Sequence, residues 1–182
     1  MTTTPGIQLK PDERQRLAAG RWRVDAAQSH AWFAAPVIGR LIRGRLPLSG
    51  EVLITDPVGN SSAWLTAATS AVSTGSPELD ELLTGPGFLD AAAFPEISFR
   101  SDALARVPTG WRALGRLQVK GTEHELACQL ALHVGDSRPG QLPSVTIASS
   151  WVIDPEWVTR HRIAALGHRV MMTCSCVLQP DC

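Results

Sequence analysis

Residues 73–99 read STGSPELDELLTGPGFLDAAAFPEISF, and this stretch predicts a short helix inserted between two strands. Ser76-Pro77 begins the helix, because a serine oxygen accepts hydrogen bonds from the free N–H groups of a first turn and proline suits that turn. The run Gly85-Pro86-Gly87 ends it. Three leucines at the i, i+3 and i+4 spacing give the helix one apolar face: Leu79, Leu82 and Leu83.

The residues on either side of this segment alternate between apolar and polar side chains, which is typical of strands with one dry face and one wet face. The clearest run is 42–56, in which Gly44 and Gly50 fall on the apolar face and predict bends in a curving strand. Other strands are predicted at 21–25, 31–35, 63–73, 96–106, 111–120, 126–134, 145–153 and 170–178.

About eight long strands with hairpin-type connections predict an antiparallel sheet rather than a parallel one. Roughly eight strands are enough to close a barrel that is filled by side chains or holds one small ligand. Closure also removes exposed sheet edges. We therefore predict an all-β fold, an extended eight-stranded antiparallel barrel with the short helical insert folded against one end. A β-sandwich is the competing architecture.

The composition fits one globular domain. The chain has 182 residues with 17 basic and 17 acidic side chains, so the charge balance gives no reason to expect nucleic acid as a partner. We expect residues 1–20 to form a flexible tail and residues 21–182 to form the domain. The N-terminus lacks an apolar signal region and no run has the length of a membrane helix, so we expect a cytoplasmic protein.

The sequence contains no pattern that is typical of catalysis or of metal binding. Its four cysteines follow neither a zinc spacing nor a Cys-x-x-Cys pattern, and we interpret them as small buried thiols with one loose thiol at the C-terminus. A disulfide or redox role is the alternative. The five histidines show no metal spacing, and helix capping and turn formation explain Asp80 and Asp90 better than acid–base catalysis does. We therefore predict no enzyme, no metal and no cofactor.

Several motifs resemble the YceI-like family, the lipocalin-like polyisoprenoid-binding proteins. The most specific ones lie in the stretch quoted first: Ser73-Thr74-Gly75, Asp80 with Leu83, Phe88-Leu89-Asp90 and Phe94-Pro95-Glu96-Ile97-Ser98-Phe99. Further matches are Trp22-Arg23-Val24-Asp25 with Ser29 and Phe33, Arg43-Gly44-Arg45 before Ser49-Gly50, the run 115–122, and Gly167-His168-Arg169-Val170. The resemblance covers about residues 21–179.

This resemblance implies an extended lipocalin-like barrel with an elongated apolar interior that takes an isoprenoid chain, and it implies no enzymatic activity by itself. The expected partner is an isoprenoid lipid, a quinone or another long apolar ligand, and a homodimer is left open. A ligand-free interaction or stress-response scaffold is the alternative function. An enzyme acting on a lipid would need strongly perturbed titratable groups facing the cavity.

The candidate ligand-binding residues are apolar members of the alternating faces: Trp22, Phe33, Val52, Ile54, Phe99, Leu117, Val119, Leu130, Trp151 and Met172. A filled barrel shows the same pattern, so a plain core position explains each of them equally. Phe88 and Phe94 are candidates to plug one end, with simple packing of the insert as the alternative. Arg40, near Arg43 and Arg45, is the candidate contact for a polar headgroup, and a solvated outer face is the alternative.

Overall fold

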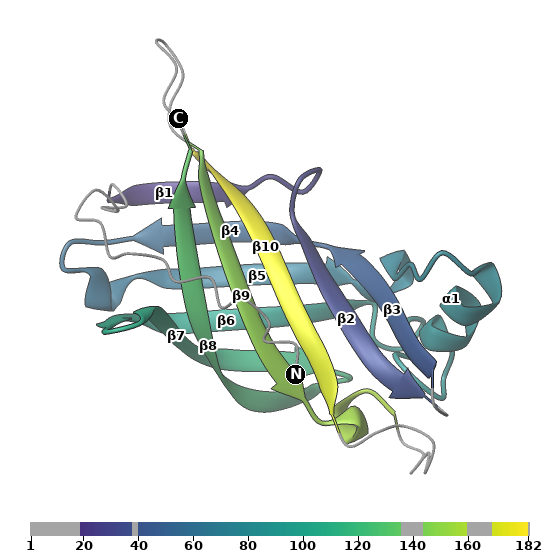
Figure 1. Cartoon of the computed structure of the whole chain (residues 1–182). Coiled ribbons are helices and arrows are strands. Elements are labelled where there is room, and N and C mark those ends of the chain that lie inside the picture. The colour runs from purple at the N-terminus through teal and green to yellow at the C-terminus, as the bar shows by residue number, and fades with distance from the viewer. Residues whose placement is uncertain (1–18, 38–39, 136–143, 160–168, 182) are drawn as a thin grey trace, which may run out of the picture.

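The computed structural model describes residues 19–37, 40–135, 144–159 and 169–181, so almost all of the predicted tail (1–20) lies outside the described residues. Strands make up most of the described chain, and they curve around a common interior (Figure 1). In chain order they are β1 (Gly20–Val24), β2 (His30–Val37), β3 (Arg40–Pro47), β4 (Ser49–Ile54), β5 (Ser62–Ala68), β6 (Glu96–Val107), β7 (Gly110–Val119), β8 (Thr122–Val134), β9 (Val145–Ile153) and β10 (Val170–Pro180).

The sheet closes on itself, because β1 pairs with β10 as well as with β4. The ten strands occupy eight positions around the barrel. β1 pairs with the end of β10 at Leu178–Pro180, and β2 pairs with the part of β10 at Met171–Ser175, so these two short strands share one position. β3 and β4 share another, because only Leu48 separates them. The predicted eight-stranded closed antiparallel barrel is confirmed.

Most observed strands match the predicted ranges to within two residues, but β8 begins at Thr122, four residues before its predicted start, and two further differences concern the runs 42–56 and 63–73. The run 42–56 is interrupted at Leu48, two residues before Gly50, whose φ is +140°. A Cβ atom at Gly50 would stand 2.0 Å from the carbonyl oxygen of Trp64, so glycine lets β5 approach at this bend. The strand predicted at 63–73 ends at Ala68, because Thr69 turns away to bind the insert. Its hydroxyl donates to the carbonyl oxygen of Phe94 at 2.8 Å.

The helix of the insert, α1 (Pro77–Thr84), begins and ends where the sequence predicts, but its first turn is held differently. The Ser76 side chain caps no backbone N–H, and its hydroxyl instead donates to Glu78 Oε2 at 2.8 Å. Asp80 Oδ1 accepts from the Thr74 N–H at 2.6 Å and from the Thr74 hydroxyl at 2.7 Å. Asp80 therefore fixes the turn that leads into the helix, in agreement with its interpretation as a turn residue.

The segment after α1 is tied to the barrel by hydrogen bonds to its backbone. Lys120 Nζ, in the turn between β7 and β8, donates to the carbonyl oxygen of Phe88. The Thr159 hydroxyl, just beyond the short helix η3 (Pro155–Trp157), donates to the carbonyl oxygen of Gly87 at 3.0 Å. α1 lies at the right-hand end of the barrel in Figure 1. The insert is thus fixed against one end of the barrel, as the sequence predicts.

Candidate ligand-binding cavity

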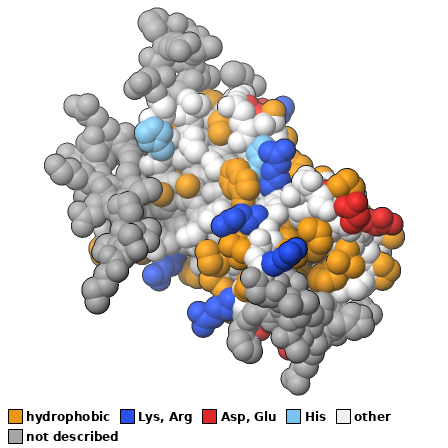
Figure 2. All heavy atoms as spheres, turned by 45° about the vertical axis from the view of Figure 1, so that its right-hand side comes forward, with side chains coloured by type: hydrophobic (Ala, Val, Ile, Leu, Met, Phe, Trp, Pro, Cys, Tyr) orange, Lys and Arg blue, Asp and Glu red, His pale blue; other side chains and the backbone are white. Residues whose placement is uncertain are grey.

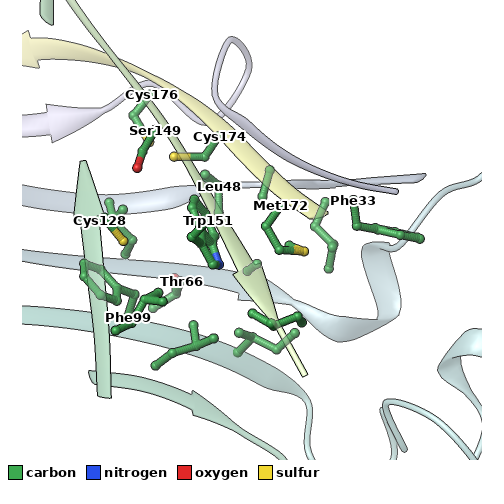
Figure 3. Close-up of a pocket in the computed structure, with 18 of the residues that line it drawn as sticks. Phe33, Leu48, Thr66, Phe99, Cys128, Ser149, Trp151, Met172, Cys174 and Cys176 are labelled. Atoms are coloured by element: carbon green, nitrogen blue, oxygen red, sulfur yellow. The ribbon is translucent and has the colours of Figure 1, made fainter. Parts of the chain in front are cut away.

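A cavity of about 280 Å³ lies inside the barrel. Side chains from every strand except β1, together with α1 and the segment after it, line this cavity. Strand side chains alternate between the two faces of the sheet, so every second residue of the predicted dry faces points inward. Figure 3 shows part of this wall, with Phe99, Cys128, Trp151 and Met172 around a common space.

The structure places nine of the ten candidate ligand-binding residues in the lining of the cavity: Phe33, Val52, Ile54, Phe99, Leu117, Val119, Leu130, Trp151 and Met172. Leu117 and Val119 are 8% and 2% exposed, whereas Phe33, Phe99 and Met172 are partly exposed. The cavity wall therefore includes both fully shielded positions and positions that solvent still reaches.

Trp22 is the candidate that does not line the cavity. It is 4% exposed and belongs to the hydrophobic core cluster that includes Val24, Val145 and Leu178. None of these four residues lines the cavity. The barrel is therefore filled around β1 and hollow elsewhere, and a core position explains Trp22, as the alternative interpretation proposed.

The cavity reaches the surface at α1. Leu79, Leu82 and Leu83 all line it, yet α1 contains no buried residue and Leu82 is 54% exposed. A side chain that contacts both the cavity and solvent marks a mouth, and this mouth lies at the end of the barrel that carries the insert. The sequence predicted the apolar face of the helix but not that this face borders a cavity, because a packed helix has the same leucine spacing.

The two phenylalanines of the insert lie in different places. Phe88 lines the cavity near α1, in agreement with a position at one end of it. Phe94 does not line the cavity. Its ring packs on Gly121 instead, where an added Cβ atom would stand 3.1 Å from Phe94 Cε1. Phe94 therefore packs the insert against the turn between β7 and β8, and only Phe88 is placed to close the mouth.

The arginines proposed for a headgroup lie outside the barrel. Arg40, Arg43 and Arg45 are exposed and none of them lines the cavity. Arg43 and Arg45 border a shallow groove on the outer face of β2, β3 and β10, beside Trp32 and Met171. Figure 2 shows basic side chains next to apolar ones on this side of the molecule. The solvated outer face is therefore the interpretation that their positions favour.

Three thiols lie on the apolar faces and line the cavity: Cys128, Cys174 and Cys176. Burial, with the nearby Cys174 as a smaller cause, raises the pKa of Cys128 to about 11. Interaction with the Cys176 thiol, followed by burial, also raises the pKa of Cys174, and the same interaction lowers the pKa of Cys176. Cys128 and Cys174 are therefore neutral thiols at neutral pH, which makes them poor nucleophiles.

The cavity offers apolar surface and very few polar groups. Within the described part of the chain, no Asp, Glu, Lys, Arg or His side chain lines it. Ser149 Oγ donates to the carbonyl oxygen of Gln129 at 2.9 Å, and Ser101 Oγ donates to that of Leu114 at 2.7 Å, so the barrel's own backbone satisfies these hydroxyls. Such a surface suits hydrophobic binding better than acid–base chemistry.

The described residues form neither a metal site nor a membrane-spanning helix. They contain no group of three His, Cys, Asp or Glu residues arranged to hold a metal ion. They also contain no helix with the length and hydropathy needed to span a membrane.

The family model of the YceI-like domain matches residues 22–159, which include the insert and most of the cavity wall. No curated protein matches the sequence significantly.

Solved structures with the same fold come from several bacteria. BcnA of Burkholderia cenocepacia is 19% identical, with a TM-score of 0.70 over 85% of this chain and 98% of that one. A polyisoprenoid-binding domain of Saccharophagus degradans, implicated in plant cell wall breakdown, is 13% identical, with a TM-score of 0.65 over 88% of this chain and 98% of that one. The YceI protein of Campylobacter jejuni is 14% identical, with a TM-score of 0.67 over 78% and 85%.

Proposed function

The chain belongs to the YceI-like domain family, and on that premise we propose that it is a non-catalytic binding or carrier protein for an isoprenoid-type lipid or quinone held inside the barrel. The observation that carries this proposal is the cavity itself, which is hollow, lined by apolar side chains and bordered at its mouth by the partly exposed leucines of α1. The solved domain from Saccharophagus degradans, described as polyisoprenoid-binding, supports this choice of ligand class.

Hydrophobic burial supplies the driving force for such binding. Each methylene group that leaves water for an apolar site contributes about 0.8 kcal/mol. A few isoprene units therefore offset the cost of immobilising a chain, and the shape of the cavity sets which chains fit. A carrier must also release its ligand, and the half-exposed helix at the mouth provides a place where a chain enters and leaves.

The lining also supports binding without chemical turnover. A general acid or base needs a titratable group within hydrogen-bond reach of the reacting atoms. In the described lining the titratable groups are thiols: burial raises the pKa of Cys128 to about 11, and interaction with Cys174 lowers the pKa of Cys176. No carboxylate, histidine or lysine lies beside them in that lining to act as a base. The proposal therefore assigns the lining residues to shape and desolvation.

The first experiment looks for the ligand. The full chain is purified without detergent, extracted with organic solvent, and the extract is analysed by mass spectrometry. We expect a long-chain apolar molecule in about equimolar amount. The decisive comparison uses Ala67→Phe, which places a ring in the cavity, and Ala68→Phe, which places the same ring on the exposed outer face one residue later. We expect Ala67→Phe to lose the copurifying molecule and Ala68→Phe to keep it.

The same experiment distinguishes the carrier function from that of a ligand-free scaffold. Exposed apolar side chains on the outer face of β2, β9 and β10 favour the scaffold: Trp32 at 40%, Val152 at 47% and Met171 at 61%. If no ligand copurifies, if added isoprenoids do not bind, and if Ala67→Phe leaves the folded protein unchanged, the carrier function is wrong and the outer face becomes the better candidate.

A further inference from the structure

Four neighbouring strands present an exposed apolar surface on the outside of the barrel. β9, β10, β2 and β3 lie side by side in the sheet and cross the front of the molecule in Figure 1. Strand pairing brings their side chains together, because Met171 of β10 pairs with Val152 of β9 and with Ala34 of β2, and Ala34 pairs with Arg43 of β3. Four large apolar side chains on this outer face are 40–61% exposed: Trp32, Leu41, Val152 and Met171.

Basic side chains lie among these apolar ones. Arg43 and Arg45 follow Leu41 at alternate positions of β3, so all three side chains point outward, and all three are exposed. Arg45 pairs with Trp32 across β2 and β3. Figure 2 shows arginines set among apolar side chains on this side of the molecule. We call this surface the outer patch, and its members are Trp32, Leu41, Arg43, Arg45, Val152 and Met171.

The outer patch has no acidic counterpart in its own strands. None of β2, β3, β9 and β10 contains an Asp or Glu residue, although the whole chain has equal numbers of acidic and basic side chains. The ion pairs within the described part of the chain are formed by other arginines: Arg21, Arg23, Arg100 and Arg116. Arg43 and Arg45 therefore form no ion pair with a described residue.

A second exposed indole shows that apolar exposure alone does not distinguish this face. Trp64, on the outer face of β5, is 55% exposed, but it pairs with Glu51 of β4 and with Arg100 of β6. Glu51 forms an ion pair with Arg21, and Arg100 forms one with Asp102. Trp64 thus lies among charges that neutralise one another, whereas the outer patch combines exposed apolar side chains with positive charge that its own strands do not balance.

The outer patch adjoins the mouth of the cavity. The backbones of Arg45 and Ser73 exchange two hydrogen bonds, each 2.9 Å long, at the point where the insert begins. The shallow groove on this face continues to the turn 73–75, which leads into α1. Within β3, Leu41 is exposed on the outer face while its neighbour Ile42 lines the cavity. A broad partner that covers the outer patch therefore lies close to the opening at α1.

We propose that the outer patch docks on the surface of a lipid bilayer that contains anionic lipids, with its apolar side chains in the headgroup region and its arginines on lipid phosphates. Arginine pairs with phosphate oxygens through two parallel hydrogen bonds, and tryptophan is enriched at the boundary between headgroups and acyl chains. This inference rests on the proposed carrier function, since a long isoprenoid dissolves in membranes, and it adds the surface from which the ligand is taken up.

A bilayer fits these observations better than a folded protein partner does. Binding to a bilayer grows with the apolar area buried and with the attraction between basic side chains and anionic lipids. It needs no matching shape on the other side, which suits the shallow groove and the curved outside of a barrel. Glu78 and Glu81 are exposed on α1 and oppose close contact of the helix with anionic lipids. The strands of the outer patch, rather than α1, therefore form the contact.

The test measures how the full chain sediments with lipid vesicles. Vesicles of phosphatidylcholine alone are compared with vesicles in which about a third of the lipid is phosphatidylglycerol, which is anionic. The double variant Arg43→Glu with Arg45→Glu reverses the charge of the outer patch. Its control is Arg106→Glu with Arg112→Glu, which makes the same change in net charge at exposed positions of β6 and β7.

We expect wild type to bind the anionic vesicles at least about tenfold more tightly than the phosphatidylcholine vesicles, because each basic side chain near an anionic surface adds to binding. The double variant in the outer patch should lose about tenfold or more on anionic vesicles, and the control should lose less than about threefold. At about 1 M salt, where the Debye length is about 3 Å, the preference for anionic vesicles should disappear.

The apolar contribution is measured with a matched pair of tryptophans. Trp32 belongs to the outer patch and Trp64 does not, and both are exposed. We expect Trp32→Ala to weaken binding to anionic vesicles by about tenfold, since the indole then contributes no apolar area to the contact, and Trp64→Ala to change it little. This pair keeps the net charge constant, so it checks the docking surface independently of electrostatics.

The outcomes distinguish docking from binding inside the barrel. Arg43 and Arg45 do not line the cavity, so their double variant should still bind farnesol in detergent-free solution. Ala67→Phe should still bind vesicles but no longer take up farnesol. If wild type binds no anionic vesicles, or if both double variants lose binding equally, the docking surface is wrong while the carrier function stands. If the outer patch binds vesicles but wild type binds no farnesol and no other isoprenoid, docking stands and the carrier function fails.

Discussion

Two phenylalanines of the cavity wall each pack against a glycine on the neighbouring strand. A Cβ atom at Gly44 would stand 2.3 Å from the Phe33 ring, and one at Gly115 would stand 2.7 Å from the Phe99 ring. Because these glycines have no side chain, each ring occupies space within the wall that a Cβ atom would otherwise take. The cavity therefore depends on residues that contribute no side chain to it.

This dependence gives a prediction for Gly44→Ala. The ring of Phe33 is the movable partner in the close contact, so the added methyl group displaces it toward the cavity. Losing space for one or two methylene groups should weaken binding of an isoprenoid probe by about tenfold. Calorimetry checks this result, with Gly59→Ala as the control, because a Cβ atom at Gly59 meets nothing within 4 Å.

A second substitution tests the cause. In the double variant Gly44→Ala with Phe33→Leu, the smaller side chain leaves room for the methyl group, and we expect affinity to recover. Equal affinities for wild type and Gly44→Ala would contradict the idea that the glycine keeps the cavity open.

The sequence predicts which residues face the barrel interior better than it predicts which part of that interior is empty. Trp22 and Trp151 both fall on dry faces of alternating strands, and alternation alone cannot separate them. Trp22 is enclosed because its short strand β1 packs with Val145 and Leu178, whereas Trp151 lies where no opposing side chain fills the interior. That difference depends on volumes summed across distant strands, which no local pattern contains.

Among the elements, α1 is unusual because hydrogen bonds fix the residues before and after it, while its own apolar face is not buried. Asp80 holds the turn before it, and Lys120 and Thr159 hold the backbone after it. The leucines of the helix border the cavity without a buried position among them. The sequence predicts the bounds and face of α1 because they are local properties. It does not predict that the Ser76 side chain caps no backbone N–H, because the turn before the helix is held by the hydrogen bonds between Thr74 and Asp80.

The contrast between α1 and the residues after it gives a prediction about stability. Leu82 and Leu89 both line the cavity, but Leu82 is 54% exposed and Leu89 is 8% exposed. Leu82→Ala should change the free energy of unfolding by no more than about 0.5 kcal/mol, whereas Leu89→Ala should lower it by about 2–5 kcal/mol. Urea unfolding followed by circular dichroism measures both values.

The pair also tells whether the helix face serves the mouth or the core. A loss of several kcal/mol in Leu82→Ala would mean that α1 contributes to the core of the folded protein. A small loss accompanied by altered binding of an isoprenoid probe would agree with a role for α1 at the mouth of the cavity.

At the scale of the whole molecule, closure of the barrel depends on how the first four strands are arranged. β1 and β2 share the edge of β10, and β3 and β4 share the next position. The ten strands therefore form a closed barrel with eight positions. The sequence predicts about eight strands, and its alternation over 42–56 treats the position that β3 and β4 share as one strand. It does not predict the break at Leu48, which lies two residues before the close approach of β5 to Gly50.

Burial of thiols in the closed barrel predicts how stability depends on pH. The Cys128 thiol has its pKa raised from 9.0 to about 11, mainly by burial. Above about pH 9 the unfolded chain releases this proton while the folded chain still holds it, so the unfolded state gains stability until about pH 11. The free energy of unfolding should therefore fall by about 2–3 kcal/mol across this window.

The control is Cys128→Ala, in which the decrease between pH 9 and pH 11 should be smaller by about that amount. Urea titrations at several pH values check the difference. The sequence contains no tyrosine and only two lysines, Lys10 and Lys120, and the three other thiols are common to both proteins, so the difference between the proteins isolates Cys128. The same decrease in both proteins would show that the Cys128 thiol is ionised as easily in the barrel as in the unfolded chain.

The tryptophans of the filled end, the cavity wall and the outer face differ in solvent exposure, and fluorescence quenching can distinguish them. With no tyrosine in the chain, ultraviolet emission comes almost entirely from six indoles. Trp32 and Trp64 are 40% and 55% exposed, whereas Trp22 is enclosed in the core and Trp151 has its nitrogen buried in the cavity wall. A water-soluble quencher such as iodide should quench the emission of the exposed indoles first. The emission that survives comes from the less exposed indoles, and among them Trp151 lines the cavity, so its share of the signal reports on what enters the barrel.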